Sequence, residues 1–339
     1  MSESDYPFSQ KVVVLGGGTG QFNLLQALVD INQPDLITAI PGTWDSGGSS
    51  GKLRTELGIL PPGDARQCLV ALMETEDQLR EALWLSEDRF KNVIGPLHGH
   101  DLLNLIIEQL SKIHQGQDRG IDAFRKLFRI RGQVNPASLT PINITAKLFN
   151  GDEVEGEAAL DERWKQPGFD PSDPGQRIDY VYIDNRPDPN PKALEAIRNA
   201  DKIILSSGSL WGSVVPHTLI VEERQAILES KAPLFMVLNL MTEPGQTDGF
   251  KASDHLRPLV DALGSNRINY LLANKNGISQ ETLDKYLREN QQPVSVDIPE
   301  CKILVPNIRV ITEPYVLEVP EQRILRHHPK LAHTILELD

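Results

Sequence analysis

The stretch Lys11–Gly20, KVVVLGGGTG, decides which fold this sequence predicts. The apolar run Val12–Leu15 predicts a buried strand, and three glycines follow it directly. Apolar residues within 22–29 then recur at three- and four-residue spacing, which is typical of a helix. Unpaired N–H groups and the helix dipole meet at such a helix start, and glycine lets the backbone approach a phosphate closely. The chain is therefore expected to begin with an α/β unit that binds a phosphate or a nucleotide.

Two familiar phosphate-binding motifs do not fit these loops. A dinucleotide motif G-x-G-x-x-G that starts at Gly16 would need glycine where Gln21 stands. The later segment SGGSSGKL resembles a P-loop, but Ser46 occupies the first glycine position. Leu53 also replaces the serine or threonine that binds magnesium after Lys52. The sequence therefore supports neither an NAD site nor a P-loop strongly.

Composition narrows the class of protein. The chain has 339 residues and a net charge of −13, which argues against a nucleic-acid-binding surface. No apolar run approaches the length of about 18 residues that a membrane span needs. The first ten residues, MSESDYPFSQ, lack the basic and apolar regions of a signal peptide, so we expect a cytoplasmic protein. Cys68 and Cys301 lie far apart and predict neither a disulfide framework nor a thiolate zinc site.

Strand and helix patterns alternate along the chain and predict an α/β fold with a mostly parallel sheet and crossover helices. Strands are predicted at 36–40, 142–148, 180–183, 202–205, 234–238 and 268–272. Helices are predicted at 78–84, 102–113, 121–128, 191–199, 217–228, 255–263 and 329–338, and another at Asp64. The helices after residue 77 predict a helical cap, and Asn150-Gly151-Asp152 predicts a β-hairpin. We expect a flexible segment 1–10 and one domain, 11–339, with this insertion around 77–177.

Unusual loops follow five of the predicted strands. Because ligands bind outside the carboxyl ends of parallel strands, these loops are expected along one edge of the sheet. They are Gly16–Gly20, Gly42–Gly51, Ser206–Ser213, Asn239–Asp254 and Ala273–Asn276. Their common position is the main argument for a single site.

The loop Gly42–Gly51 is too poor in apolar residues to predict regular structure. A solvated surface loop is the usual interpretation of such a run, but its place directly after a strand favours a function. Asp45 could hold magnesium while backbone N–H groups and serine hydroxyls meet phosphate oxygens. Lys52 and Arg54 could neutralise phosphate charge. The remaining candidates in this segment are Gly47, Gly48, Ser49 and Ser50.

Further candidates lie along the chain. Asp64 is either the N-cap of a helix or, with Arg66, part of an anion site at its start. A turn rich in donors before a helix contains Ser207, Gly208 and Ser209. Asn239 and Thr242 could contact a base or a sugar. Weaker features are Trp211, which is expected in the core, His98 and His100, which form a poor zinc signal, and His327 and His328, which are expected to be exposed.

Together, several motifs resemble one known family. In chain order they are GGGTG, DSGGSSGKLR, LPPGDARQCLVAL, GHDLLNL, SGSLWGSVVP, NLMTEPGQTDGFKASDH and ILRHHPKLA. From about Lys11 to its C-terminus the chain resembles the gluconeogenesis-factor family, within the 2-phospho-L-lactate transferase-like superfamily. The resemblance implies a Rossmann-like α/β fold and a cytoplasmic protein that self-associates as a homodimer or larger homo-oligomer. It also implies binding of a UDP-sugar such as UDP-N-acetylglucosamine, and a role in cell shape and gluconeogenic growth.

The resemblance also implies roles for particular residues. Phosphate contacts would come from Gly17, Gly18, Thr19 and Gly20 and from Ser207, Gly208 and Ser209. Asp45 would be the catalytic or magnesium-binding carboxylate, Asn239 and Thr242 would face the nucleotide, and Arg326 would close over the ligand. Ser46 departs from the family pattern, because a second aspartate is common at that position.

Three functions stay open at this point. The first is a UDP-sugar-binding factor. The second is a magnesium-dependent transferase that moves a phospholactyl group from a nucleotide diphosphate-linked donor to a deazaflavin. The third is a nucleotide-sensing scaffold that acts through partner proteins.

Overall fold

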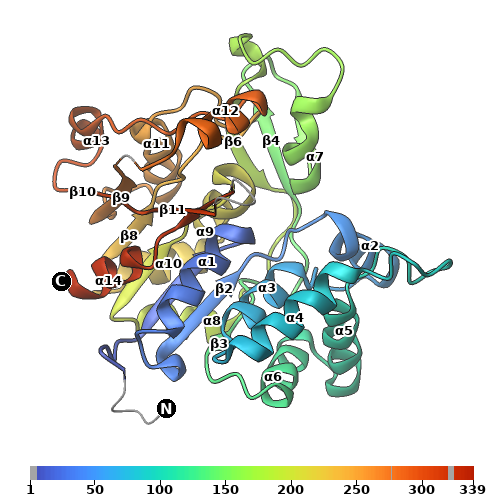
Figure 1. The fold of residues 1–339 in the computed structure, drawn as a ribbon. Helices are drawn as coiled ribbons and strands as arrows, with labels where there is room; N and C mark the ends of the chain where they lie inside the picture. The colour runs from blue at the N-terminus through green and yellow to red at the C-terminus, as the bar shows by residue number, and fades with distance from the viewer. Residues whose placement is uncertain (1–5, 276, 320–323) are drawn as a thin grey trace.

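The computed structural model describes residues 6–275, 277–319 and 324–339, so the predicted flexibility of residues 1–5 and the position of Asn276 lie outside the described residues. The main sheet contains β1 (Val12–Gly16), β2 (Ile37–Pro41), β3 (Gln133–Val134), β7 (Lys202–Leu205), β8 (Leu234–Val237), β9 (Tyr270–Asn274) and β10 (Arg309–Glu313). Within the described residues these strands are parallel and lie in the order β10-β9-β8-β7-β1-β2-β3 (Figure 1). The predicted α/β architecture is confirmed.

Helices cover both faces of this sheet (Figure 1). On the face that carries Val12 and Val14 the core is completed by α1 (Gly18–Val29), α3 (Gly63–Ala71), α5 (Leu102–His114), α6 (Gln117–Leu127) and α14 (Lys330–Glu337). On the face that carries Val13 and Leu15 it is completed by α8 (Pro191–Arg198), α9 (Val215–Leu219), α10 (Val221–Glu229), α11 (Ala252–Leu263) and α13 (Ile298–Leu304). Both faces are buried, which explains the nearly continuous apolar strands.

The remaining helices are α2 (Gly48–Leu57), α4 (Glu76–Asp88), α7 (Glu157–Glu162) and α12 (Gln280–Arg288). Short 3-10 segments at 34–36, 163–165 and 174–176 and a π-helical segment at 210–214 connect the longer elements. Helices α4, α5 and α6 form the predicted helical cap beside the sheet (Figure 1). None of the helices within the described ranges has the length and apolar character of a membrane span.

A second, antiparallel sheet has the order β5-β4-β6, with β4 (Ile144–Leu148), β5 (Glu153–Glu155) and β6 (Ile178–Ile183). The predicted hairpin at Asn150-Gly151-Asp152 joins β4 to β5. The prediction that 180–183 belongs to the parallel sheet is wrong, because β6 pairs antiparallel with β4. Tyr180, on β6, is exposed, and such one-sided burial suits an antiparallel sheet with one face in water.

Two helix predictions need correction. The loop predicted at Gly42–Gly51 becomes helical from Gly48, where α2 begins. A Cβ on Gly51 would overlap the backbone of Ser46, so small residues pack closely in this helix. The helix depends on that tertiary packing, and its sequence therefore shows no apolar periodicity. The single helix predicted at 217–228 is divided into α9 and α10 at Ile220, whose backbone is extended and whose side chain is buried.

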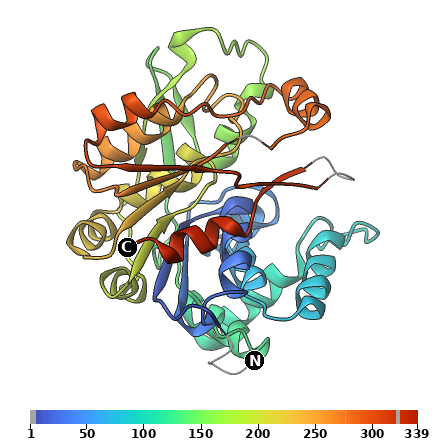
Figure 2. The same ribbon diagram turned by 60° about the vertical axis from the view of Figure 1, so that its left-hand side comes forward.

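The chain ends are attached to the same region of the molecule. The N–H of Phe8 donates to the carbonyl of Ile31 at 3.1 Å, and the side chain of Gln10 donates to the carbonyl of Leu336 at 2.9 Å. A hairpin of β11 (Val316–Val319) and β12 (Ile324–His327) precedes α14. Both β12 and α14 contact α1 (Figure 2).

Candidate functional site

The direction of strand order reverses between β1 and β7, and two of the predicted loops lie at this point. From β1 the chain proceeds to β2 on one side, while β7 to β10 extend on the other. A ligand of an open parallel sheet binds at such a switch point, outside the carboxyl ends of the strands. The glycine turn after β1 and the Ser207–Ser209 turn after β7 therefore occupy the position that the predicted site requires.

These turns contact each other through their backbones. A Cβ on Gly20 would overlap the carbonyl of Ser207, so this close approach requires glycine. The side-chain amide of Asn239, after β8, accepts from the Gly208 N–H at 3.2 Å and donates to its carbonyl at 2.7 Å. Asn239 thus holds the Gly208 turn in place, a role that differs from the predicted contact with a nucleotide.

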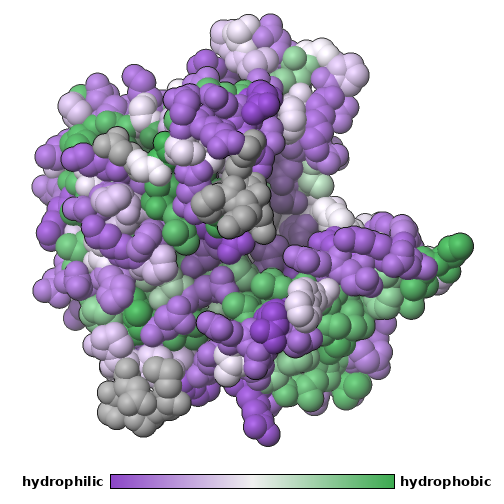
Figure 3. All heavy atoms as spheres, in the orientation of Figure 1, coloured by the Kyte–Doolittle hydropathy of each residue, from purple (hydrophilic) through white to green (hydrophobic). Residues whose placement is uncertain are grey.

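A cavity of about 250 Å³ lies beside the glycine turn. Its lining comes from seven separate segments of the chain: the predicted residues Gly18, Asp45, Gly47, Gly48, Ser49, Ser50 and Asp64, together with Gly63, Arg66, Gln67, Arg89, Asn104, Glu157 and Ser213. Figure 3 shows a hollow between the lobe that carries α2, α4 and α5 and the part of the chain that carries α7. The structure therefore brings the glycine turn, the start of α2 and the start of α3 together.

Asp64 occupies the anion position of the first glycine turn. Its Oδ1 atom accepts a hydrogen bond from the backbone N–H of Gly18 at 3.1 Å. The N-cap prediction for Asp64 is wrong, since Pro62 is the N-cap and Asp64 lies in the first turn of α3. Burial, reinforced by the negative charge of Asp45, raises the pKa of Asp64 to about 7, despite the lowering effect of the Gly18 N–H.

Two arginines give the same cavity a cationic wall. Arg66 is buried, with its Nε 3.4 Å from Asp101 Oδ2 and a hydrogen bond from Nη1 to Ser86 Oγ at 3.0 Å. Burial lowers the pKa of Arg66, and the positive charge of Arg89 lowers it further. Arg89 itself makes no ion pair with any described carboxylate. Arg66 and Arg89 are the cationic side chains of this lining, which also contains the carboxyl groups of Asp45, Asp64 and Glu157.

Asp45 projects into the cavity beside the start of α2. Its Oδ1 accepts from the N–H of Gly47 at 2.8 Å. Burial raises the pKa of Asp45, whereas the Gly47 N–H and the Ser50 hydroxyl lower it. A Cβ on Gly63 would lie 2.6 Å from Asp45 Oδ2, so glycine is needed there for this carboxylate to keep its place.

Sequence reasoning missed a third carboxylate of this cavity, Glu157, at the start of α7. Burial, with the negative charges of Asp161 and Asp45 nearby, raises the pKa of Glu157 to about 9. Ser46, which stands where the family often has aspartate, instead accepts the N–H of Ala158 at 3.0 Å and so holds α7. Nothing in the local sequence indicates that α7 reaches this site.

The described residues contain no group of three or more His, Cys, Asp or Glu side chains placed to hold a metal ion. Asp45 and Asp64 nevertheless face the same cavity. Magnesium commonly binds to one or two carboxylates and completes its coordination with phosphate oxygens. The residues present therefore fit Mg²⁺ only together with a phosphate-bearing ligand.

Several other predicted residues have structural partners. Ser49 Oγ accepts from the N–H of Asp101 at 3.1 Å and lies 3.3 Å from His100 Nδ1. Arg54 donates to the carbonyls of Trp44 at 3.3 Å and Ile142 at 2.8 Å, so it ties the loop to the antiparallel sheet. Lys52 is exposed, and its Nζ lies near Gly99. A Cβ added to Gly99 would be 3.6 Å from this nitrogen.

The turn after β7 is held from several sides. Ser209 Oγ donates to Gln246 Oε1 at 2.8 Å, and Ser207 Oγ lies 3.2 Å from His327 Nδ1. The expectation that His327 is exposed is wrong, because its side chain is half-buried, and burial lowers its pKa to about 4. Trp211 lies in the core, as predicted.

Thr242 and Arg326, two further candidates, do not line this cavity. Thr242 is buried and exchanges hydrogen bonds with the backbone of Gln292, at 2.7 and 2.9 Å. Arg326 lines a different cavity, of about 300 Å³, with Asn23 and Gln26 of α1. Thr19, in the first turn of α1, is exposed.

A buried contact between His217 and Glu223 supports the glycine turn. His217 Nδ1 lies 2.9 Å from Glu223 Oε1, and both side chains are inaccessible to solvent. His217 Nε2 lies 3.3 Å from the carbonyl oxygen of Gly16, which can only accept. Nε2 therefore carries a proton and anchors the turn. The edge of the Trp44 ring packs against the same imidazole.

Comparison with known proteins places this chain in a family. A family model described as 2-phospho-L-lactate transferase CofD matches residues 12–316. The chain belongs to the CofD family. Two relatives named gluconeogenesis factor are similar over nearly their whole length. The one from Halalkalibacterium halodurans is 38% identical over 97% of this chain and 96% of its own. The one from Bacillus subtilis is 34% identical over 97% of this chain and 98% of its own.

A solved structure agrees with the same assignment. The crystal structure of a UPF0052 family member from Bacillus halodurans has a TM-score of 0.86 and 38% sequence identity. The comparison covers 97% of this chain and 99% of that chain. The resemblance that the motifs indicated, and the Rossmann-like fold that it implied, are confirmed for this CofD-family chain.

Proposed function

We propose that this CofD-family protein binds a UDP-sugar, UDP-N-acetylglucosamine being the first ligand to test, and acts as a cytoplasmic factor in gluconeogenic growth and cell shape. The observation that carries the proposal is the cavity at the start of α2. There Arg66 and Arg89 supply positive charge, the helix N-terminus at Gly48 supplies N–H groups, and the pKa values of the neighbouring carboxyl groups of Asp45, Asp64 and Glu157 are raised. A diphosphate has the charge and oxygen acceptors that this wall would bind.

A buried acceptor in the same cavity supports this proposal. The Oδ1 atom of Asn104 is buried without a hydrogen-bond partner among the described residues, while its Nδ2 donates to Ser49 Oγ at 3.4 Å. Buried polar atoms are normally paired, so an unpaired acceptor in a cavity wall favours a ligand with donors. Sugar hydroxyl or acetamido groups carry such donors.

The nucleoside has room along the same edge of the sheet. A cavity of about 520 Å³ lies beyond the ends of β8, β9 and β10 and includes Asn239, Leu240, Ser295 and Thr312 in its lining. Asn239 connects this cavity to Gly208. We propose that the diphosphate lies over the glycine turns and that the nucleoside extends toward this second cavity.

The experiment is calorimetric titration with UDP-N-acetylglucosamine and, separately, with GDP, each with and without Mg²⁺. We expect UDP-N-acetylglucosamine to bind without a requirement for magnesium, and Arg89→Ala to weaken it about tenfold, a loss of about 1.4 kcal/mol. Arg80→Ala, on the exposed side of α4, is the matched control. Binding of GDP alone, with turnover of a deazaflavin acceptor in Mg²⁺, would replace this proposal with the transferase.

We also propose that the protein self-associates, as the family resemblance implies. Apolar side chains are exposed on α4 and on the segment that follows it: Trp84, Leu85, Val93, Ile94 and Leu97. Figure 3 shows hydrophobic surface over this lobe and at the tip of the segment. A second copy of the chain would cover these side chains.

A further inference from the structure

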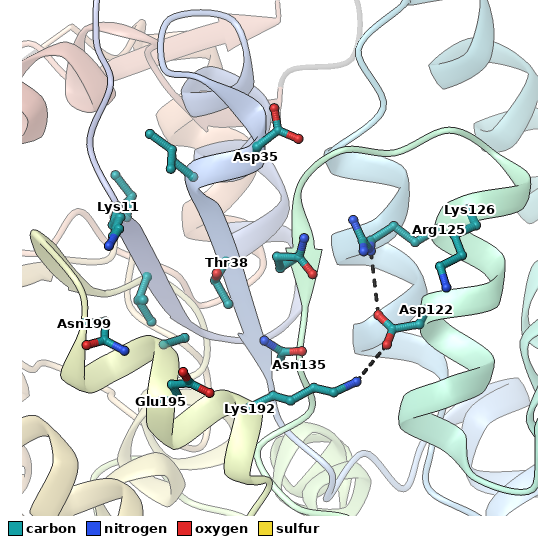
Figure 4. Close-up of a pocket in the computed structure, with 15 residues that line it drawn as sticks. Lys11, Asp35, Thr38, Asp122, Arg125, Lys126, Asn135, Lys192, Glu195 and Asn199 are labelled. Carbon is teal, nitrogen blue, oxygen red and sulfur yellow. Dashed lines mark hydrogen bonds and ion pairs between the residues drawn. The ribbon is translucent and has the colours of Figure 1, made fainter.

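A separate cavity, of about 440 Å³, lies at the other end of the central strands. It opens over Lys11 and Val12, where β1 begins, and is bounded by α6 and α8 (Figure 4). Strand β1 contains five residues, so at about 3.3 Å per residue the glycine turn lies about 16 Å away. This cavity is therefore distinct from the site at the carboxyl ends of the strands.

Polar residues form the floor of this cavity where a parallel sheet normally carries apolar ones. Thr38 is paired in register with Val13, on the face of β2 opposite to the buried Ile37 and Ala39. Asn135 follows β3, and its N–H donates to the carbonyl of Ala39 at 2.9 Å, which fixes its backbone beside β2. Figure 4 shows the side chains of Thr38 and Asn135 facing the space between α6 and α8.

The side-chain amide of Asn135 is the strongest sign of a ligand. The residue is only 8% exposed, and its amide makes no hydrogen bond with any described residue. The amide nitrogen and oxygen are not sealed from solvent, so they reach the space of the cavity and can bind water or a ligand. Because the amide faces the cavity, a bound molecule with both a donor and an acceptor would satisfy it.

The walls of the cavity are fixed by ion pairs. Lys192 Nζ, on α8, lies 2.7 Å from Asp122 Oδ2, on α6 (Figure 4). Arg125 Nε lies 3.8 Å from the other oxygen of Asp122. The Lys192–Asp122 contact joins α6 to α8, whereas the Arg125–Asp122 contact lies within α6. Lys11 and Lys126 have no carboxylate partner for their ammonium groups among the described residues. Cationic side chains outnumber carboxylates in the lining.

We propose that this cavity binds a small polar metabolite with an acidic group, a carboxylate or a phosphate. Asn135 and Thr38 would hydrogen-bond to its polar groups, and the lysines at the rim would attract its charge. The volume falls within the range of about 300–1,000 Å³ that is usual for small-molecule sites. The proposal does not depend on UDP-sugar binding at the other end of β1.

The experiment first locates a bound anion in the crystal and then measures the affinity of anions in solution. Crystals of the full chain are soaked in selenate, whose anomalous signal identifies bound tetrahedral anions. Phosphate and citrate are titrated by calorimetry in an Arg89→Ala background, which weakens binding at the other site. We expect an anomalous peak beside Asn135, and binding of phosphate or of citrate according to the acidic group preferred.

Asn135→Asp keeps the size of the side chain and adds a negative charge, and we expect it to weaken binding at least tenfold. Lys126→Ala should weaken it several-fold, and Lys302→Ala, an exposed lysine on α13, should leave it unchanged. Circular dichroism confirms that each variant is folded. Absence of the selenate peak, affinity unchanged by Asn135→Asp, or equal binding of an uncharged polyol would overturn the proposal.

Discussion

The Oδ1 atom of Asp64 lies 3.1 Å from the backbone nitrogen of Gly18, so a carboxylate of the chain itself occupies the anion position at the start of α1. A phosphate at Gly18 would have to replace this carboxylate or share it through a cation. The start of α2 also meets an internal carboxylate, because Asp45 Oδ1 accepts from the N–H of Gly47 at 2.8 Å. A phosphate at either glycine-rich loop would therefore meet a carboxylate of the chain, and Arg89 is the cationic side chain beside the second loop.

Asp64→Asn tests how much free energy of unfolding is lost by burying the Asp64 carboxylate beside Gly18. The native pKa of Asp64 is raised to about 7 from 3.8, so its carboxyl group favours the folded state at low pH. That contribution is complete below about pH 4 and is lost as the pH rises through 7. Asp64→Asn should raise the free energy of unfolding at pH 8 by about 1–3 kcal/mol and flatten its dependence on pH between 4 and 7. Urea unfolding at several pH values measures both, and Asp77→Asn, on the exposed side of α4, is the control.

Substitution of Arg66 should mainly lower the stability of the fold, whereas substitution of Arg89 should mainly lower ligand affinity. Arg66→Ala leaves the buried Asp101 carboxylate without its cation and should cost about 3–5 kcal/mol of unfolding free energy. Arg89 is exposed and without an ion pair, so Arg89→Ala should change stability by less than about 0.5 kcal/mol. Thermal unfolding measures the first effect and ligand titration the second. Equal losses of stability in both variants would contradict the assigned roles.

Gly63→Ala tests how Asp45 is placed. The new Cβ would overlap Ser50 Oγ and lie 2.6 Å from Asp45 Oδ2, so both the hydroxyl and the carboxylate must move. We expect a loss of about 1–3 kcal/mol in stability and loss of any magnesium-dependent ligand binding. Gly47→Ala is a matched comparison for stability, because its nearest neighbour, Asp45 Oδ1, would be at an ordinary 3.5 Å. A crystal structure with Asp45 unmoved would refute the argument.

Asp45→Asn separates a metal role from a packing role. The substitution keeps the shape of the side chain but removes the charge that a hard cation needs. Nucleotide affinity measured with and without Mg²⁺ should lose its magnesium-dependent part, while affinity in EDTA stays the same. If wild-type affinity never responds to Mg²⁺, Asp45 is not a metal ligand.

Ile94→Glu tests self-association. Ile94 is fully exposed and lies between the exposed Val93 and Leu97. A buried glutamate would oppose any interface there, so light scattering should show a smaller assembly for the variant than for the wild type. Ile303→Glu, an exposed isoleucine on α13, is the control. The same molar mass for Ile94→Glu and wild type would exclude this surface.

Local patterns were enough for much of the fold. The strand, turn and helix from Val12 to Val29 were predictable because burial on both faces produces continuous apolar strands and a 3.6-residue helix period. The start of α2 was not predictable, because small residues in close contact form it without any apolar stripe. Strand β6 was assigned to the wrong sheet, because pairing partners are not visible in the local pattern.

The sequence by itself determined the alternation of strands and helices, the family and the glycine turns, because each depends on residues close together in the chain. Only the tertiary structure decided which charges meet at the cavity. Arg89 directly follows α4 and Glu157 begins α7, and no local motif connects them to Gly18 or Asp45. Long-range packing sets these distances, and burial there, by removing water, shifts the pKa values of the carboxylates.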